Sequence, residues 1–513
     1  MFFLFFVNSY DDYTIHPFKN KLESVTIPLP EVAHMTRLEK DSLGLVEVPL
    51  NAYYGAQTVR SLTNFPITLK PIHPMMVRAL GMIKLAATIS NHKVGYIDKK
   101  RLHYIQIAAQ EVIDGLLNDH FVTDAIQGGA GTSAHMNVNE VIANRANELA
   151  NFPLGTYKFI HPNDHLNFGQ STNDVYPSAG RIASIFLVED LLESLRLLQV
   201  SLLKKSEEFE DVLKMGRTHL QDAIPIQLGQ EFKAFATSIG RDIKRIKIAF
   251  NDLRSVNMGA TAVGTGLNAD ENYKRIVVKE LSKVCGITLT SARDLVDSTR
   301  NVDVFVWASS SLKTCAVNLS KMSNDIRLMA SGPLAGFNEI NLPEKQPGSS
   351  IMPGKINPVI AEVVNQVCFN VFGNDVTILK AAEAGQLELN VFEPVMFYKL
   401  FESIETMTHA CDTFRVNLID GITANKARCE DMVESSIGNI TAVAPHIGYA
   451  NASLLAQKAL IERRKLRDVI LESGLLSERD LNIILKPKSL TRPGISGKQL
   501  LKTKLKDQDH END

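Results

Sequence analysis

The sequence predicts a mostly α-helical protein organised around a long central helical bundle. Two observations lead to this prediction. Proline is absent from residues 226–332, 359–393 and 395–444, and because an interior proline costs a helix about 3 kcal/mol, such segments favour long helices. In these segments and in one earlier segment, apolar residues also recur at steps of three and four, which is the spacing of one helix face.

Three segments carry such an apolar seam, and each is expected to form a long helix. The seams are Ile182, Ile185, Leu192, Leu195 and Leu198 within residues 179–203, then Leu312, Ala316, Leu319, Met322, Ile326 and Met329, and finally Leu400, Ile404, Met407, Cys411, Phe414 and Leu418. Because each seam must be buried against other helices, the three together predict an elongated bundle. Their apolar surface exceeds what one subunit can cover, and we therefore expect an oligomer.

The regions around the bundle differ from it in composition, and a chain of 513 residues can hold about three domains. Residues 36–172 mix short helices with connections rich in Gly, Pro and Asn, and are expected to form an N-terminal domain. Residues 173–427 would form the central bundle, and residues 428–498 a C-terminal domain of shorter helices. We expect the extension at residues 1–35 to be disordered. Residues 499–513 form a polar tail, and its charged part from Lys502 to Asp513 is expected to be disordered as well.

Charge and cysteine content narrow the classes of function. The net charge of −2 gives no support to binding of nucleic acid or of an anionic membrane surface. No apolar run approaches the length of about 20 residues that spans a bilayer. The five cysteines are far apart and odd in number, so neither a disulfide framework nor a zinc site is indicated. A reducing compartment fits best, and we expect the protein in the cytoplasm.

Four polar islands interrupt the helical pattern, at residues 128–133, 169–174, 216–221 and 348–358. Each places hydroxyl or amide side chains just before an expected helix. One interpretation is N-capping, since Ser, Thr, Asn and Asp satisfy the free N–H groups of a helix start. The same N–H groups also bind carboxylates, so several converging starts would form a dicarboxylate pocket.

The fourth island, Gly-Ser-Ser-Ile-Met-Pro-Gly-Lys-Ile-Asn-Pro, is a poor helix and a poor strand. Its composition predicts a mobile loop that closes over an anion, with Ser349 and Ser350 handling protons and Lys355 as the fixed charge. The glycines Gly348 and Gly354 would act as hinges. A polar turn between helices is the alternative, because Gly, Ser, Asn and Pro dominate turns.

Two other features allow more than one interpretation. Residues 264–269 match the pattern GxGxxA, but they lack a preceding strand and a βαβ context, which favours a tight connection over a dinucleotide site. His219 lies within a polar island, where a structural role and a substrate contact both stay open. No histidine pair has metal-ligand spacing and no carboxylate pair is singled out, so metal catalysis is disfavoured.

Taken in order, these motifs resemble the signature of the aspartase/fumarase superfamily, from about residue 37 to residue 498. The resemblance rests on Gln-Ser-Thr-Asn-Asp at 170–174, Gly-Arg-Thr-His at 216–219, Gly-Thr-Gly-Leu-Asn at 264–268 and the loop at 348–358. Other segments are more similar to aspartate ammonia-lyases than to class II fumarases. They are Asn-Glu-Ile-Asn-Leu-Pro at 338–343, Val-Asn-Gln-Val-Cys at 364–368, Glu-Ala-Gly-Gln-Leu-Glu-Leu-Asn-Val at 383–391, and Asn-Lys at 425–426.

The resemblance implies a three-domain subunit whose central helices join those of three others in a twenty-helix bundle. Such a homotetramer would draw each active site from three subunits. The implied reaction is the reversible deamination of L-aspartate to fumarate and ammonia, by anti-elimination through an aci-carboxylate and without an organic cofactor. Fumarate hydratase, acting on malate, is the nearest alternative. A non-catalytic structural homologue, of the kind recruited as lens crystallins, is a more distant one.

Matching motif positions also imply roles for individual residues. Ser349 would be the general base that removes the proton from the carbon next to the β-carboxylate. The remaining assignments are Thr132, Ser171, Thr172 and Ser350 for the β-carboxylate, Thr218, Lys355 and Asn357 for the α-carboxylate, and Asn173 and His219 for the amino group. Removing the proton builds a second negative charge on the β-carboxylate, which preaimed hydroxyl and N–H donors can stabilise.

The chain departs from the family pattern at one position. His135 stands where the related Asn-Met-Asn segment usually begins with asparagine. If that amide supports the neighbouring Thr132, the substitution affects substrate affinity.

Overall fold

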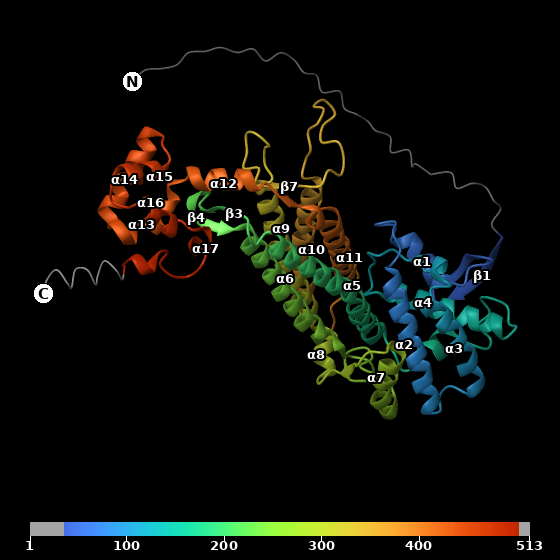
Figure 1. The fold of residues 1–513 in the computed structure, drawn as a ribbon. Helices are drawn as coiled ribbons and strands as arrows, with labels where there is room; N and C mark the ends of the chain where they lie inside the picture. Colours follow the sequence, from blue (N-terminus) through green and yellow to red (C-terminus); the bar gives the residue numbers. More distant parts are fainter. Residues whose placement is uncertain (1–34, 502–513) are drawn as a thin grey trace, which may run out of the picture.

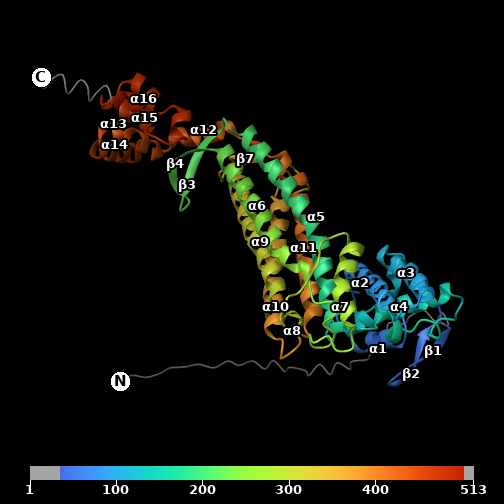
Figure 2. The same ribbon diagram turned by 90° about the horizontal axis from the view of Figure 1, so that it is seen from below.

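The computed structural model describes residues 35–501, so the expectations for residues 1–34 and 502–513 lie outside the described residues. Five long helices lie side by side and form the elongated centre of the subunit (Figures 1 and 2). They are α5 (Thr172–Glu208), α6 (Leu228–Asn251), α9 (Asp303–Met329), α10 (Val359–Glu383) and α11 (Glu393–Asn417). The predicted mostly helical class is confirmed.

The predicted apolar seams are buried in this bundle. Every seam residue on α5, on α9 and along α11 to its C-cap Leu418 belongs to one continuous core. That core runs on from the bundle into the N-terminal part of the chain. The spacing of three and four residues therefore identified the faces that pack. The expectation that these seams exceed what one subunit can cover is wrong, because the helices of a single subunit bury all of them.

Helix α5 begins seven residues before the predicted segment and passes through Pro177. Because proline has no N–H, it leaves the carbonyl of Asn173 without its usual helical donor. The side chain of Asn257 replaces that donor, with its Nδ2 atom 3.0 Å from the Asn173 carbonyl oxygen. A partner distant in sequence thus lets the helix continue through the proline.

The N-terminal part packs at one end of the bundle (Figure 1). Its elements are the hairpin β1 (Thr36–Asp41) and β2 (Gly44–Pro49), followed by α1 (Ala56–Asn64), α2 (Pro74–Lys93), α3 (Lys99–Ile113) and α4 (Thr132–Leu149). At this end, α2 contacts both α5 and α7 (Glu271–Cys285). The short helix α8 (Leu295–Arg300) and the parallel pair β5 (Ser255–Val256) and β6 (Thr290–Ser291) complete it.

The opposite end carries an antiparallel hairpin, β3 (Leu213–Thr218) and β4 (Gln221–Gln227), and the pair β7 (Ile340–Asn341) and β8 (Thr423–Ala424). Beyond it lie α12 (Lys426–Ser435), α13 (Ile440–Ile447), α14 (Tyr449–Glu462), α15 (Leu466–Glu472), α16 (Glu478–Ile484) and α17 (Pro487–Leu490). These last helices have a small core of their own, with Val443, Val469 and Leu481 fully buried. The proposed domain boundaries at residues 172 and 427 stay predictions.

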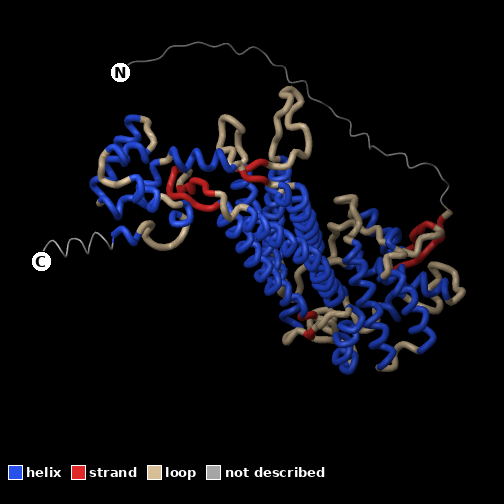
Figure 3. Tube along the Cα trace, in the orientation of Figure 1, coloured by secondary structure: helices blue, strands red, loops and turns tan. Residues whose placement is uncertain are grey.

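The strands are short and lie at the ends of the helical body (Figure 3). The remaining regular segments are the 3₁₀ turns Asn118–His120, Asp252–Arg254, Ile419–Gly421 and Ile437–Asn439, and a π turn at Pro162–Leu166. Within residues 35–501, no helix combines the length and the apolar character that crossing a membrane requires.

Candidate active site

The first two polar islands meet at the N-termini of α4 and α5. Gly131, the N-cap of α4, has φ 85°, and a β-carbon there would lie 2.5 Å from ring atoms of Tyr176 in α5. Only glycine allows this close approach. It brings Thr132, the first residue of α4, against the helix start that carries Ser171, Thr172 and Asn173.

The N-capping interpretation is confirmed for Ser171, whose hydroxyl oxygen accepts a hydrogen bond from the Asn173 N–H at 3.2 Å. The carboxylate of Asp174 completes the capping box by accepting from the Ser171 N–H at 3.0 Å. Thr132 donates its hydroxyl to the Gly129 carbonyl at 2.7 Å and remains exposed. Capping and ligand binding are compatible here, because capping orders the helix start that a carboxylate would approach.

Asp174 also fixes the neighbouring loop to this helix start. Its other carboxylate oxygen accepts hydrogen bonds from the backbone N–H groups of Gly259 and Thr261, at 3.1 and 3.0 Å. The side chain of Asn173 donates to the carbonyl of Ala262 at 2.7 Å. Asp174 is fully buried, and burial raises the pKa of its carboxyl to about 6. The glycine-containing segment at 264–269 is therefore part of a connection anchored to α5.

The third island is a β-hairpin, and the expectation that it precedes a helix directly is wrong. Residues 216–221 lie at the end of β3, in the turn and at the start of β4, and α6 begins only at Leu228. His219 and Leu220 form the turn with φ of 55° and 58°. The residues on both sides of the turn pair as strands and do not cap a helix. Thr218 and His219 are exposed at the tip of the hairpin.

A buried carboxylate holds this hairpin in place. Arg217 forms an ion pair with Glu339 at 2.7 Å, and its guanidinium lies 4.1 Å from the centre of the Phe337 ring. Lys214 pairs with the other oxygen of Glu339 at 3.0 Å. The Glu339 side chain has no exposed surface, so these contacts are shielded from water.

The fourth island folds into a closed loop between β7 and α10. The N–H of Gly348 donates to the Lys355 carbonyl at 2.8 Å, and the side chain of Asn357 donates to the Gly348 carbonyl. Ser349 lies inside this ring, where its hydroxyl oxygen accepts hydrogen bonds from the backbone N–H groups of Ile351 and Met352 at 3.2 and 3.1 Å. Such donors favour the negatively charged form of an oxygen.

The four islands form two groups at opposite ends of the bundle (Figure 1). One end carries Thr132, Ser171, Thr172 and Asn173, and the other carries Thr218, His219, Ser349, Ser350, Lys355 and Asn357. Helix α5 separates the groups with 37 residues, a length of about 55 Å at 1.5 Å per residue. Within one subunit, a dicarboxylate cannot contact both groups.

Comparison with known proteins relates this arrangement to a family. The family described as lyase matches residues 44–373, and the one described as fumarase C C-terminus matches residues 440–492. The chain belongs to the aspartase/fumarase superfamily. An aspartate ammonia-lyase from Bacillus sp is 54% identical over 463 residues, which cover 90% of this chain and 99% of that protein. An aspartate ammonia-lyase from Escherichia coli is 46% identical over 466 residues, covering 90% and 98%.

Solved structures of the superfamily share the fold. A protein described as fumarate lyase:delta crystallin from Brucella melitensis, bound to cobalt, is 45% identical with a TM-score of 0.88. A class II fumarase from Schistosoma mansoni is 34% identical with a TM-score of 0.86. Each match covers 90% of this chain and all of the other. In residues 35–501 of this superfamily member, no group of three or more His, Cys, Asp or Glu side chains is placed to hold a metal.

Two residues near the candidate site could not be found from the sequence. Glu339 belongs to a subfamily segment, but its pairing with the hairpin depends on contacts across more than 100 residues. Lys84 lies in no motif, and its ammonium is 2.6 Å from His135. The only signal in the sequence for this contact is the departure from the family pattern at His135. Its ring contacts Thr172, with Nδ1 2.8 Å from the hydroxyl oxygen.

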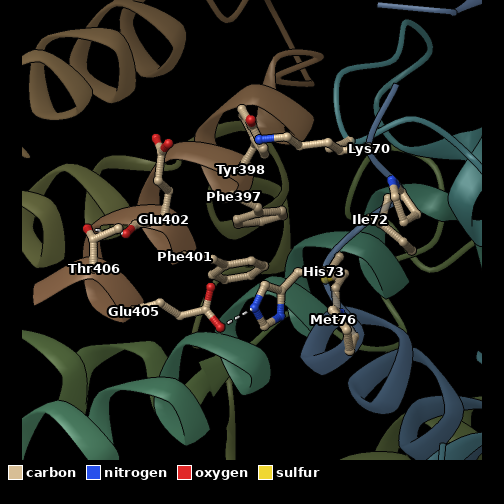
Figure 4. Close-up of a pocket in the computed structure, with 13 residues that line it drawn as sticks. Lys70, Ile72, His73, Met76, Phe397, Tyr398, Phe401, Glu402, Glu405 and Thr406 are labelled. Carbon is tan, nitrogen blue, oxygen red and sulfur yellow. Dashed lines mark hydrogen bonds and ion pairs between the residues drawn. The ribbon is translucent and has the colours of Figure 1, made fainter. Parts of the chain in front are cut away.

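A separate cavity of about 280 Å³ lies between the start of α2 and α11 (Figure 4). Phe397 and Phe401 line it, and His73 pairs with Glu405 at 2.8 Å on its wall. None of the predicted site residues lines this cavity.

Proposed function

We propose that this protein catalyses the reversible elimination of ammonia from L-aspartate to give fumarate. The observation that carries the proposal is the similarity to aspartate ammonia-lyases at 46–54% identity over nearly their whole length. The class II fumarase from Schistosoma mansoni matches over the same share of the chain at only 34% identity. The protein is therefore a carbon–nitrogen lyase.

Ser349 is the proposed general base. Its oxygen takes the proton from the carbon next to the β-carboxylate, and the electron pair of the broken C–H bond moves into that carboxylate as an aci-carboxylate. Collapse of this intermediate forms the C=C bond and breaks the C–N bond on the opposite face, so that ammonia leaves. The two backbone N–H donors at Ser349 support the role, because a serine is a weak base unless its alkoxide is stabilised.

The proposed β-carboxylate site is formed by Thr132, Ser171 and Thr172 with Ser350. The first three lie together at two helix N-termini, where hydroxyl and N–H donors and the positive ends of the helix dipoles favour an anion. Stabilisation matters most at this carboxylate, because it gains the second negative charge during the reaction.

The α-carboxylate and the amino group are assigned to the remaining residues. Thr218, Lys355 and Asn357 would hold the α-carboxylate, with Lys355 as the charged partner. Asn173 and His219 would face the amino group. These side chains come from the hairpin tip, the closed loop and the start of α5, so substrate binding would require the separated ends of the bundle to meet.

We infer a homotetramer in which the two ends of the bundle, contributed by different subunits, meet. Four copies of the five long helices would give a bundle of twenty helices, and an antiparallel neighbour would place its hairpin and loop beside the starts of α4 and α5. Large apolar side chains on the bundle surface support this association. Ile248, Trp307, Val317, Phe369 and Val376 are each at least half exposed in the single subunit.

All five cysteines are unpaired and buried. This supports the expectation of a reducing compartment, and we place the protein in the cytoplasm.

An assay of the purified protein with L-aspartate or L-malate, followed by the ultraviolet absorbance of fumarate, tests the reaction. We expect fumarate from L-aspartate, accompanied by an equal amount of ammonia. Fumarate from malate and none from aspartate would instead establish a fumarate hydratase. No fumarate from either substrate would favour the non-catalytic homologue.

A further inference from the structure

A buried lysine lies directly behind the proposed β-carboxylate site. Lys84 of α2 is 0% exposed, and its Nζ atom lies 2.6 Å from Nε2 of His135, which is 1% exposed. Two further contacts reach the same ammonium, from Oε1 of Gln170 at 2.9 Å and Oδ1 of Asn167 at 3.4 Å. A fully buried lysine is costly to keep, so its partners define what it does.

The surroundings of Lys84 suit an ammonium that donates in three directions. The orientation of Gln170 is fixed independently, because its Nε2 donates to the carbonyls of Leu166 at 2.9 Å and Phe168 at 3.3 Å. Its Oε1 atom must then be the acceptor facing Lys84. An ammonium has three donors and no acceptor, so His135 Nε2 accepts the remaining hydrogen bond.

Accepting at Nε2 sets the tautomer of His135 and, through it, the direction of the next hydrogen bond. A neutral imidazole that accepts at Nε2 carries its proton on Nδ1. That N–H then donates to the Thr172 hydroxyl oxygen, 2.8 Å away. Thr172 accepts at its oxygen, which leaves its own hydroxyl proton to donate outward.

Burial opposes the charged form of Lys84, and the two acceptor oxygens of Gln170 and Asn167 that face its Nζ atom favour it. Burial lowers the pKa of Lys84 well below its usual value, while the carboxylate of Asp174 counteracts that effect. A bound dicarboxylate would add negative charge beside Thr172 and favour the ammonium further. A neutral amine would instead accept from Nε2–H, and the Thr172 hydroxyl would then have to donate to Nδ1.

We propose that Lys84 and His135 form a positioning relay that holds the Thr172 hydroxyl as a hydrogen-bond donor to the β-carboxylate of the bound dicarboxylate. The inference rests on the proposed substrate contact of Thr172. It also explains how a histidine can stand at position 135. An asparagine there would offer a carbonyl oxygen to the lysine and an N–H to the threonine. Histidine and asparagine at position 135 would therefore give the hydrogen bonds of the relay the same direction.

A double-mutant cycle on the full-length protein tests the relay. The single variants are Lys84→Met, His135→Leu and Thr172→Val, and the first two are each also combined with Thr172→Val. The measurement is the inhibition constant of succinate. Succinate is a dicarboxylate that has no amino group to eliminate, so its inhibition constant reports binding alone. Thermal unfolding and oligomer mass show that each variant is folded, and Ser90→Ala, a buried hydroxyl on the same helix, is the matched control.

We expect each single variant in the relay to raise the inhibition constant roughly 10- to 100-fold, the range for a hydrogen bond to a charged group. In the Thr172→Val background, Lys84→Met and His135→Leu should add less than about twofold, because the group they position is gone. His135→Asn should stay within about threefold of the parent, and Ser90→Ala should leave binding unchanged.

Two results would contradict different parts of the reasoning. If the effects of Lys84→Met or His135→Leu multiply with that of Thr172→Val, the relay is wrong although Thr172 binds substrate. If Thr172→Val alone leaves succinate binding unchanged, the proposed substrate contact of Thr172 is wrong. Should Lys84→Met fail to fold, the cycle of His135→Leu with Thr172→Val gives the same answer.

Discussion

Replacing Glu339 with glutamine should destabilise the protein and impair catalysis together. The substitution keeps the shape of a fully buried side chain and removes the charge that pairs with Lys214 at 3.0 Å and Arg217 at 2.7 Å. Breaking a buried ion pair costs about 3–5 kcal/mol when it leaves a charge uncompensated. Lys214 retains Glu231 at 2.9 Å and Arg217 retains the Phe337 ring, so we expect the lower end, about 3 kcal/mol.

Urea unfolding at one fixed protein concentration measures the free energy, and kcat/KM for L-aspartate reports the position of the hairpin that carries Thr218 and His219. Glu231→Gln is the matched control. It removes a charge from the same Lys214, but its side chain is 26% exposed, and we expect a loss of about 1 kcal/mol. If Glu339→Gln costs no more than Glu231→Gln and leaves kcat/KM unchanged, Glu339 does not hold the hairpin.

Three further predictions concern the base, a helix and a glycine. Ser349→Ala should lower kcat for L-aspartate at least about 100-fold without changing oligomer mass, as removal of a general base does; near-normal turnover would refute the assigned base. Asn257→Ala should cost about 1 kcal/mol in urea unfolding by leaving the part-buried carbonyl of Asn173 without a donor. The cost should shrink in a Pro177→Ala background, and an equal cost in both backgrounds would contradict the compensation. Gly131→Ala should destabilise more than Gly95→Ala, because both have positive φ but only the first meets an aromatic ring; equal thermal shifts would argue against that close contact.

The sequence alone predicted the features that depend on local spacing. The seams on α5, α9 and α11 are buried because steps of three and four residues place side chains on one helix face regardless of the partner. The start of α5 could not be found in this way. An interior proline such as Pro177 disfavours a helix, and the helix continues through it because Asn257, 84 residues after Asn173, supplies the missing donor.

In the candidate site, too, local motifs could be predicted from the sequence and contacts between distant residues could not. The polar islands were recognisable as motifs, and hydroxyl groups at helix starts correctly indicated N-capping at Ser171. Their grouping into two ends depends on the length and direction of α5, which spacing along the chain does not reveal. Buried charges such as Lys84 and Glu339 were also out of reach, because their partners lie far away in sequence.

In the proposed tetramer, residues at opposite ends of the bundle, in different subunits, form one active site for L-aspartate. Mixed oligomers test it most directly. Ser349→Ala should be inactive at one end, and the double variant Thr132→Val/Thr172→Val should be impaired at the other. After the two are unfolded together and reassembled in equal amounts, random assortment should leave about one quarter of the sites with both ends intact. We predict about a quarter of the parental activity with L-aspartate. Activity no higher than the average of the two separate variants would contradict a shared site.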